Sequence, residues 1–193
     1  MRNSVPKNLW IAVAVTAAWT SAAGAAELAG VKLDDTVNVG GTALVLNGAG
    51  LRTKFGAKVY VAGLYVPAKS ADAASIFAGT GPRKMKLVMK RNVSADTMWG
   101  AFREGIEANS TPSELKALQP KLEKMEKAFN ALGKTAEGDV LEFDFAADGT
   151  TAFSVNGQAK ETIPGQDLST AFLKIWLGAK PAQEPLKKAL LGG

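Results

Sequence analysis

Two runs of sequence decide the fold of this chain: Leu46-Asn-Gly-Ala-Gly-Leu-Arg52 and Lys58-Val-Tyr-Val-Ala-Gly-Leu-Tyr-Val66. The second run is apolar after its first residue and rich in β-branched and aromatic side chains, and Pro67 ends it, so it predicts a long strand. The glycines of the first run predict a turn or a bulge. Taken alone, Arg52 is most simply interpreted as an exposed side chain beside that turn, because the run lacks the Gly-Lys-Ser/Thr ending of a phosphate-binding loop.

The long strand carries the only two tyrosines of the chain, Tyr60 and Tyr65. An odd separation places them on opposite faces of the strand. The face of Tyr65 is the more apolar and suits the main core, with the Tyr65 hydroxyl near the strand end where it can reach water. Tyr60 shares its face with the small Ala62 and is placed to border a cavity. The alternation itself is compatible with either face lining a cleft.

Further strands surround this one. Short β-branched or alternating segments, separated by Gly-Gly, Asp-Gly and Asn-Gly turns, predict strands over residues 36–39, 42–46, 83–90, 140–145, 150–155 and 158–163. In residues 83–90 charged and apolar side chains alternate, which indicates a strand with one face in water.

The middle and the end of the chain predict helices. Ser94 is a favourable N-cap, and Thr111-Pro-Ser-Glu114 has the pattern of a capping box. Pro120 is expected to kink or divide the helix that follows. Two more helices are predicted over residues 167–177 and 181–191. This order of elements predicts one α+β domain, an antiparallel sheet with helices packed on one face.

The N-terminus has the three-part layout of a signal peptide. A positive start, an apolar run of about a dozen residues and a small-residue cleavage site follow one another within residues 1–26. We therefore expect residues 27–193 to form the mature domain, in the periplasm or outside the cell. Loss of Arg2 and Lys7 would lower the net charge from +5 to about +3.

The absent residue types exclude much chemistry. The chain has no cysteine and no histidine, so it has no Ser-His-Asp triad, Cys-His dyad or usual zinc site. No metal and no cofactor is expected. Lysine and arginine are not interleaved with aromatic residues in the manner of nucleic-acid-binding proteins, so no nucleic-acid partner is expected either. Contact with a membrane is expected to be transient at most.

The two opening runs, in this order and spacing, resemble the signature region of the chalcone isomerase superfamily. The helix start near Val93-Ser94-Ala95, the Asn156-Gly157 hairpin and the Ile175-Trp-Leu-Gly178 tail are also similar to bacterial chalcone isomerase-like proteins with signal peptides. The likeness covers roughly residues 28 to 192. It implies an open-faced β-sandwich, in which a long antiparallel sheet is covered on one face by a layer of helices and a ligand cleft lies between them.

The resemblance also implies a choice of functions. Some superfamily members close a chalcone into a flavanone, and others bind fatty acids; in both, the arginine at the position of Arg52 faces the cleft. The enzymes carry Tyr-x-x-Lys-x-x-x-Asn at the start of the first long helix, where this chain has Asn92-Val-Ser-Ala-Asp-Thr-Met-Trp99. At the position of Tyr60 the enzymes have Thr and the fatty-acid binders have Tyr. These departures favour binding over catalysis.

The leading hypothesis is a non-catalytic binder of a fatty acid or a similar small amphipathic carboxylate. Arg52 would anchor the carboxylate with its planar guanidinium, and Tyr60 would donate a further hydrogen bond. Trp99 and Phe102 are candidates for the apolar wall of the cleft, although ordinary core packing also explains them. The alternatives are an isomerase acting on a chalcone-like enone or phenolic substrate through Arg52 and Tyr60, and a structural envelope protein with a vestigial cleft.

Overall fold

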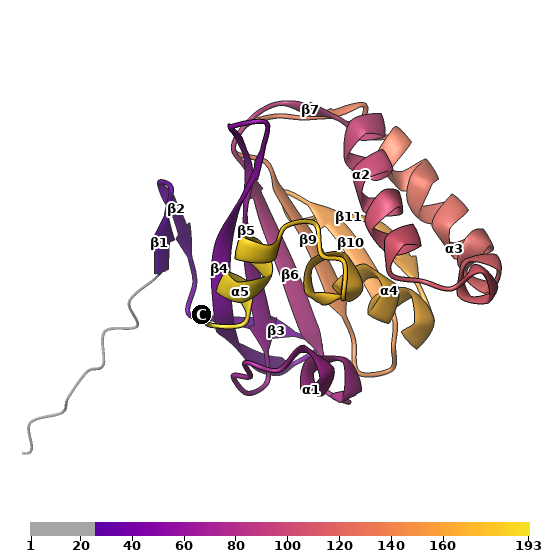
Figure 1. Cartoon of the computed structure of the whole chain (residues 1–193), viewed down its shortest axis with the longest axis horizontal. Helices are drawn as coiled ribbons and strands as arrows, with labels where there is room; N and C mark the ends of the chain where they lie inside the picture. The colour runs from indigo at the N-terminus through magenta and orange to yellow at the C-terminus, as the bar shows by residue number, and fades with distance from the viewer. Residues whose placement is uncertain (1–25) are drawn as a thin grey trace, which may run out of the picture.

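A computed structural model describes residues 26–193, which form a curled, seven-stranded antiparallel sheet and five helices (Figure 1). The expected signal peptide falls almost wholly on residues 1–25 and lies outside the described residues. The strand order is β11-β10-β9-β6-β5-β4-β3. These strands are β3 (Thr36–Val39), β4 (Thr42–Lys54), β5 (Ala57–Val66), β6 (Arg83–Met89), β9 (Val140–Phe145), β10 (Thr151–Val155) and β11 (Gln158–Ile163).

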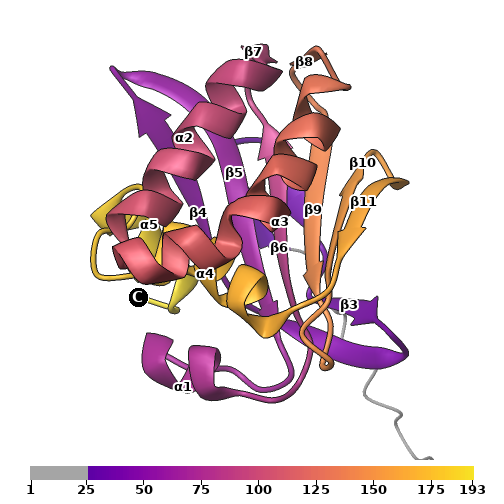
Figure 2. The same ribbon diagram turned by 90° about the vertical axis from the view of Figure 1, so that its right-hand side faces the viewer.

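The helices lie on one face of this sheet, as Figure 2 shows. They are α1 (Ala73–Ala78), α2 (Ala95–Ala108), α3 (Pro112–Asn130), α4 (Gln166–Leu177) and α5 (Glu184–Leu190). Two small two-stranded sheets complete the fold, β1 (Ala26–Leu28) with β2 (Val31–Leu33) and β7 (Val93–Ser94) with β8 (Lys134–Thr135). The expected α+β arrangement, an open sheet with one helical layer, is confirmed.

Local sequence signals explain where the two long helices begin. The Ser94 hydroxyl accepts a hydrogen bond from the Thr97 amide, and Thr111 and Glu114 form the reciprocal bonds of a capping box. Pro120 does not divide α3, which continues through it to Asn130. The apolar stripe of the helix outweighs the local defect, because Leu118 and Leu122 on either side of the proline are buried in the core.

The sheet separates two hydrophobic clusters. The larger lies between the sheet and the helices and includes Tyr60, Ala62 and Leu64 of β5. The smaller lies on the opposite face under the β1–β2 hairpin and includes Val61 and Tyr65. The prediction that the Tyr65 face belongs to the main core was therefore wrong, because both faces of the strand are apolar and the helices pack on the face of Tyr60.

Tyr65 also corrects a second expectation. Its side chain is fully buried, and its hydroxyl has no hydrogen-bond partner among the described residues, whereas the sequence suggested contact with water. Burial, together with the nearby carboxylates of Asp34, Glu142 and Asp35, raises the pKa of Tyr65 far above its usual range. The β1–β2 hairpin was not among the predicted strands, and it is this hairpin that closes the second face near Tyr65.

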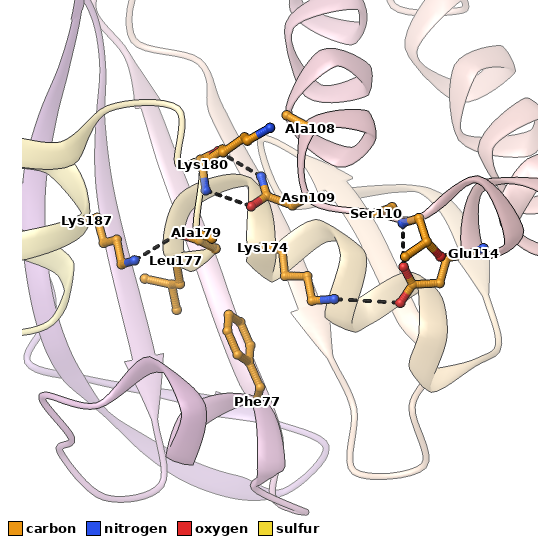
Figure 3. A pocket seen from close by; sticks show the side chains of 12 residues that line it. Phe77, Ala108, Asn109, Ser110, Glu114, Lys174, Leu177, Ala179, Lys180 and Lys187 are labelled. Carbon is orange, nitrogen blue, oxygen red and sulfur yellow. Dashed lines mark hydrogen bonds and ion pairs between the residues drawn. The ribbon is translucent and has the colours of Figure 1, made fainter.

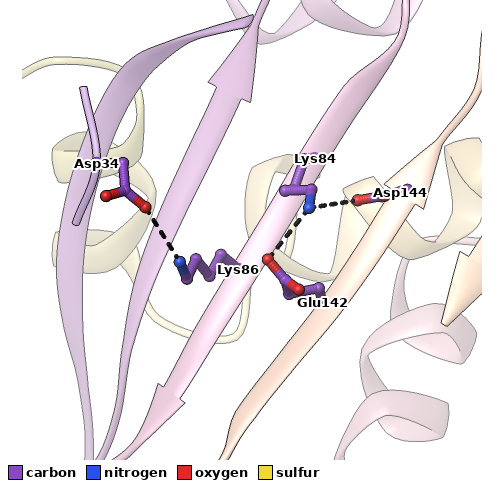
Figure 4. A network of polar contacts seen from close by, with 5 residues as sticks. All are labelled: Asp34, Lys84, Lys86, Glu142 and Asp144. Atoms are coloured by element: carbon purple, nitrogen blue, oxygen red, sulfur yellow. Dashed lines mark hydrogen bonds and ion pairs between the residues drawn. The ribbon is translucent and has the colours of Figure 1, made fainter. Parts of the chain in front are cut away.

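The expected wet face of β6 is largely covered. Lys84 is buried, and its Nζ lies 3.1 Å from carboxylate oxygens of both Glu142 and Asp144 on β9, as Figure 4 shows. Lys86 reaches Asp34 at 3.5 Å in the same network. Burial alone lowers the pKa of Lys84, but the two carboxylates outweigh it and the net direction is upward. Cross-strand ion pairs thus replace water on this face.

Among the described residues, no helix is long and apolar enough to cross a membrane.

Candidate functional site

A cleft of about 400 Å³ lies between β4 and β5 of the sheet, helix α2 and the segment that links α4 to α5. Pockets of a few hundred Å³ or more are the usual size for small-molecule sites. The sheet contributes Arg52, Lys54, Val59 and Tyr60 to its lining. The opposing walls are mainly apolar or small, with Thr97, Glu104 and Lys180 as their polar members. The apolar and small residues are Met98, Ala101, Phe102, Gly105 and Ala108 of α2, Ile175 of α4, and Pro181 and Ala182 of the α4–α5 link.

The glycines before Arg52 form the surface of β4 on which helix α5 packs. Strand β4 runs unbroken through them with a bulge between Leu46 and Gly48, so of the two predicted possibilities, turn or bulge, the bulge is the one present. A Cβ atom at Gly48 would lie 2.1 Å from the Ala189 carbonyl oxygen, and one at Gly50 would lie 2.6 Å from a methyl of Leu186. The absence of side chains at Gly48 and Gly50 therefore lets α5 pack directly on the backbone of β4.

Helix α5, once packed on β4, orients Arg52 through Gln183. Gln183, the residue at the N-cap of α5, does not cap its own helix. Its Oε1 instead accepts hydrogen bonds from Arg52 Nη1 at 3.2 Å and from the Thr53 amide at 3.0 Å, and its Nε2 donates to Thr53 Oγ1 at 3.1 Å. Arg52 Nη1 also donates to the Thr53 carbonyl at 2.8 Å. Arg52 is thus a half-buried strand residue held from one side, rather than a free side chain in a turn.

Much of the Arg52 guanidinium remains available to a ligand. All hydrogen bonds given above for Arg52 come from Nη1, and no carboxylate among the described residues forms an ion pair with it. The Nε and Nη2 donors are the ones that could meet a planar anion such as a carboxylate.

Tyr60 lies directly opposite Arg52 in the β4–β5 ladder and is held from the helical layer. Its hydroxyl oxygen accepts a hydrogen bond of 3.0 Å from Nε1 of Trp176 on α4, in a buried setting. An indole N–H can only donate, so the Tyr60 proton stays free for another acceptor. Burial raises the pKa of Tyr60, and the Trp176 bond and the Arg52 charge offset this only in part. Tyr60 therefore stays protonated throughout the physiological pH range, where it is a hydrogen-bond donor and is not available as a base.

The structure brings Arg52, Tyr60 and Phe102 together on one cleft and leaves Trp99 out of the lining. Trp99 is turned into the core, where its ring centroid lies 5.6 Å from that of Phe129 on α3. One residue along an α-helix is a rotation of about 100°, so Met98 borders the cleft while Trp99 faces the neighbouring helix. The expectation that Trp99 forms part of the cleft wall is therefore not met, and core packing accounts for this residue.

A second hollow, of about 530 Å³, lies beyond the end of α4 (Figure 3). Its polar groups are largely occupied with one another: Lys187 Nζ donates to the Gly178 carbonyl at 2.8 Å, Asn109 Oδ1 accepts from the Lys180 amide at 2.9 Å, and Glu114 accepts from the Thr111 amide. Although it is the larger hollow, it lacks the pair of free donors that Arg52 and Tyr60 present in the cleft. Among the described residues no cluster of acidic side chains could hold a metal ion.

Sequence reasoning missed Gln183 and Trp176 as parts of the site. Gln183 is 131 residues from Arg52 in the chain, and Trp176 is 116 residues from Tyr60. Trp176 lies in the Ile175-Trp-Leu-Gly178 tail that contributes to the family resemblance, but nothing in that pattern pairs it with Tyr60, and Gln183 was marked only by its place just after Pro181.

Comparisons with known proteins agree with this fold. A search of curated proteins found no match. Among solved structures, the chain is similar to a fatty-acid binding protein of Arabidopsis thaliana, with a TM-score of 0.62 and 14% sequence identity over 84% of this chain and 92% of that one. At that identity the likeness is one of fold. The sequence model of the chalcone isomerase-like family matches residues 25–192, nearly the whole described structure, and the chain therefore belongs to the chalcone isomerase-like family.

Proposed function

We propose that this protein is exported and that it is a non-catalytic binder of a fatty acid or a similar small amphipathic carboxylate, held in the cleft between β4, β5 and α2. One observation carries the proposal: Arg52 and Tyr60 face each other across the ladder as free donors, on a cleft whose other walls are mainly apolar. A carboxylate accepts bonds from both donors, and an alkyl chain gains about 0.8 kcal/mol for each CH₂ that it buries. The fatty-acid binding activity of the Arabidopsis protein of the same fold supports this assignment.

The chemistry of the site favours binding over isomerisation. A raised pKa keeps Tyr60 protonated, and the described cleft offers as its only carboxylate Glu104, an exposed residue of α2. Gln183 and Trp176 fix the two donors from behind, which suits a site that holds an anion in one place. The N-terminal residues 1–26 supply the export signal in this proposal.

The test compares an acid with its alcohol. Delipidated protein is titrated calorimetrically with a saturated fatty acid and with the matching alcohol. Acids of about 12 to 16 carbons are used, because molecules of this size are comparable in volume with the cleft. Because hydrogen bonds to charged groups contribute about 1.5–3 kcal/mol, Arg52→Ala should weaken binding of the acid about 10- to 100-fold and change binding of the alcohol little.

Arg91→Ala is the matched control, since Arg91 is exposed and does not line the cleft. If Arg52→Ala lost affinity equally for the acid and for the alcohol, Arg52 would not be the anchor of the carboxylate. Native mass spectrometry of protein purified from cells provides a second test: a stoichiometric lipid acid is expected. Protein that is empty and ignores added fatty acids would overturn the binder proposal, and turnover of an enone substrate would then favour the isomerase.

A further inference from the structure

The turn between β4 and β5 exposes an aromatic ring to solvent. Phe55 is 98% exposed and is the one large hydrophobic side chain so exposed among the described residues. It lies in the two-residue loop between β4 and β5, the two longest strands of the sheet. Figures 1 and 2 show that this hairpin ends on the side of the sheet opposite α1. Lone exposed hydrophobic residues are common, so exposure by itself assigns no role.

The backbone at Phe55 makes its presence harder to explain by folding alone. Phe55 and Gly56 form a two-residue hairpin loop with φ of 52° and 77°, the positive values that a type I′ turn requires. The chain builds the β10–β11 turn with almost the same angles, 51° and 75°, from Asn156 and Gly157, the preferred pair. A bulky aromatic residue is strained where asparagine is not. The β4–β5 turn therefore holds an exposed ring at a cost to stability.

Positive charge surrounds this ring. Lys54 Nζ lies 5.7 Å from the centre of the Phe55 ring, and Lys58 is exposed on the other strand of the hairpin. Lys90 and Arg91 follow β6 beside the start of β5, where the Lys90 amide donates to the Val59 carbonyl at 2.8 Å. Of these four cations only Lys90 forms an ion pair among the described residues, with Glu137 at 3.8 Å.

The hairpin is also continuous with the cleft, because Lys54 and Val59 line it while Phe55 stands just beyond them. An exposed ring flanked by unpaired lysines is the combination that binds the interface of an anionic bilayer, where the ring enters the headgroup region and the lysines meet acidic lipids. We propose that the β4–β5 hairpin tip, residues Lys54 to Lys58, docks this protein on anionic membrane surfaces and brings the mouth of the cleft to the lipid. Docking of this kind does not depend on which ligand the cleft holds.

Flotation with phosphatidylcholine vesicles, with and without phosphatidylglycerol, tests the docking. The wild-type protein should float with the anionic vesicles at low salt and not with the neutral ones. Phe55→Asn should lower the partition coefficient about tenfold, because the ring no longer enters the interface. The melting temperature of this variant should stay the same or rise, because asparagine suits the turn. Weaker vesicle binding therefore cannot be attributed to unfolding. Fatty-acid binding in solution should be unchanged, which separates this inference from the proposed function.

Two lysine variants distinguish docking by the hairpin from general electrostatic attraction between the protein and a charged membrane. Lys58→Ser should lower the partition coefficient about fivefold at low salt, as one lysine near an anionic surface contributes. Lys69→Ser removes the same charge from the opposite end of the sheet and should change it less than twofold. Equal losses in the two variants, undiminished binding by Phe55→Asn, or no binding by the wild type would overturn the proposal. The proposal would also be overturned if sedimentation showed a dimer that depends on Phe55 while the protein did not bind vesicles.

Discussion

Replacement of Gly48 by alanine tests whether the last helix really sits on bare backbone. The added Cβ would lie 2.1 Å from the Ala189 carbonyl oxygen and 2.8 Å from the Leu190 carbonyl oxygen, and neither backbone atom can rotate away. The φ angle of Gly48 is not in the left-handed region, so alanine meets no backbone penalty of its own. The whole cost of the substitution is therefore the displacement of α5.

Two bounds fix the size of that cost. Insertion of one methyl into a packed site commonly costs about 1–3 kcal/mol when neighbours can adjust, and here they are backbone atoms. If α5 leaves the sheet, Leu186 and Leu190, which are 1% and 0% exposed, lose their burial, at about 1.5–3 kcal/mol each. We expect a loss of about 3–6 kcal/mol in the free energy of unfolding, which for a domain of this size is roughly 10 °C or more in melting temperature.

The assay is urea denaturation of Gly48→Ala beside Gly100→Ala. Gly100 is an exposed residue inside α2, and a Cβ there meets no atom within 4 Å, so alanine should stabilise the protein by about 0.5–1 kcal/mol. Below its melting temperature, Gly48→Ala should also bind fatty acid more weakly, because Gln183 moves with α5 and releases Arg52. A Gly48→Ala protein as stable as the wild type would refute the seating of α5 on β4.

The same substitution should have opposite effects at the two tyrosines of β5. Tyr60→Phe leaves the buried Trp176 Nε1 without its acceptor and should destabilise the protein by about 1–3 kcal/mol. The loss in a Tyr60→Phe, Trp176→Phe double variant should be smaller than the sum of the two single losses, because both substitutions remove the same hydrogen bond. Tyr65→Phe removes a buried hydroxyl that has no partner among the described residues and should raise the free energy of unfolding by about 1 kcal/mol in urea. Burial raises the pKa of both hydroxyls, so the folded protein holds their protons more tightly than the unfolded chain does. Their titration leaves the free energy of unfolding unchanged below about pH 10 and lowers it as the pH rises from there through the folded-state values. Tyr65→Phe should therefore show a shallower loss of stability above pH 10 than the wild type, and an unchanged slope would contradict this assignment.

Local signals in the sequence were sufficient for most of the elements. The capping residues Ser94 and Thr111 and the Asn156-Gly157 turn predicted their helix and hairpin boundaries, because each acts through neighbours within a few residues. Arg52, Tyr60 and Phe102 line one cleft; the resemblance pointed to Arg52, while the faces of the strand and of the helix pointed to Tyr60 and Phe102, and their role in binding stays a prediction.

Contacts between distant segments were beyond the reach of such signals. Alternation along β6 indicated a wet face, but Lys84 meets Glu142 and Asp144 on a strand more than 50 residues away, and that pairing removes it from water. Trp99 and Trp176 are both aromatic residues on apolar helix faces; only the packing of α2 against α3 and of α4 against the sheet decides that Trp176, and not Trp99, meets Tyr60. The role of Gln183 depends on the docking of the last helix in the same way.

The dependence of Arg52 on α5 has a consequence for the order of folding. The proposed anion site joins Arg52 of β4 to Gln183 at the N-cap of α5, 131 residues further along the chain. Contacts of such long sequence separation close late, after local helices and hairpins have formed. A nascent chain can therefore complete its sheet and most of its helical layer while its arginine is still free to move. Arg52 is oriented only after α5 has been synthesised and has docked on β4, so the proposed anion site forms later than the sheet that carries it.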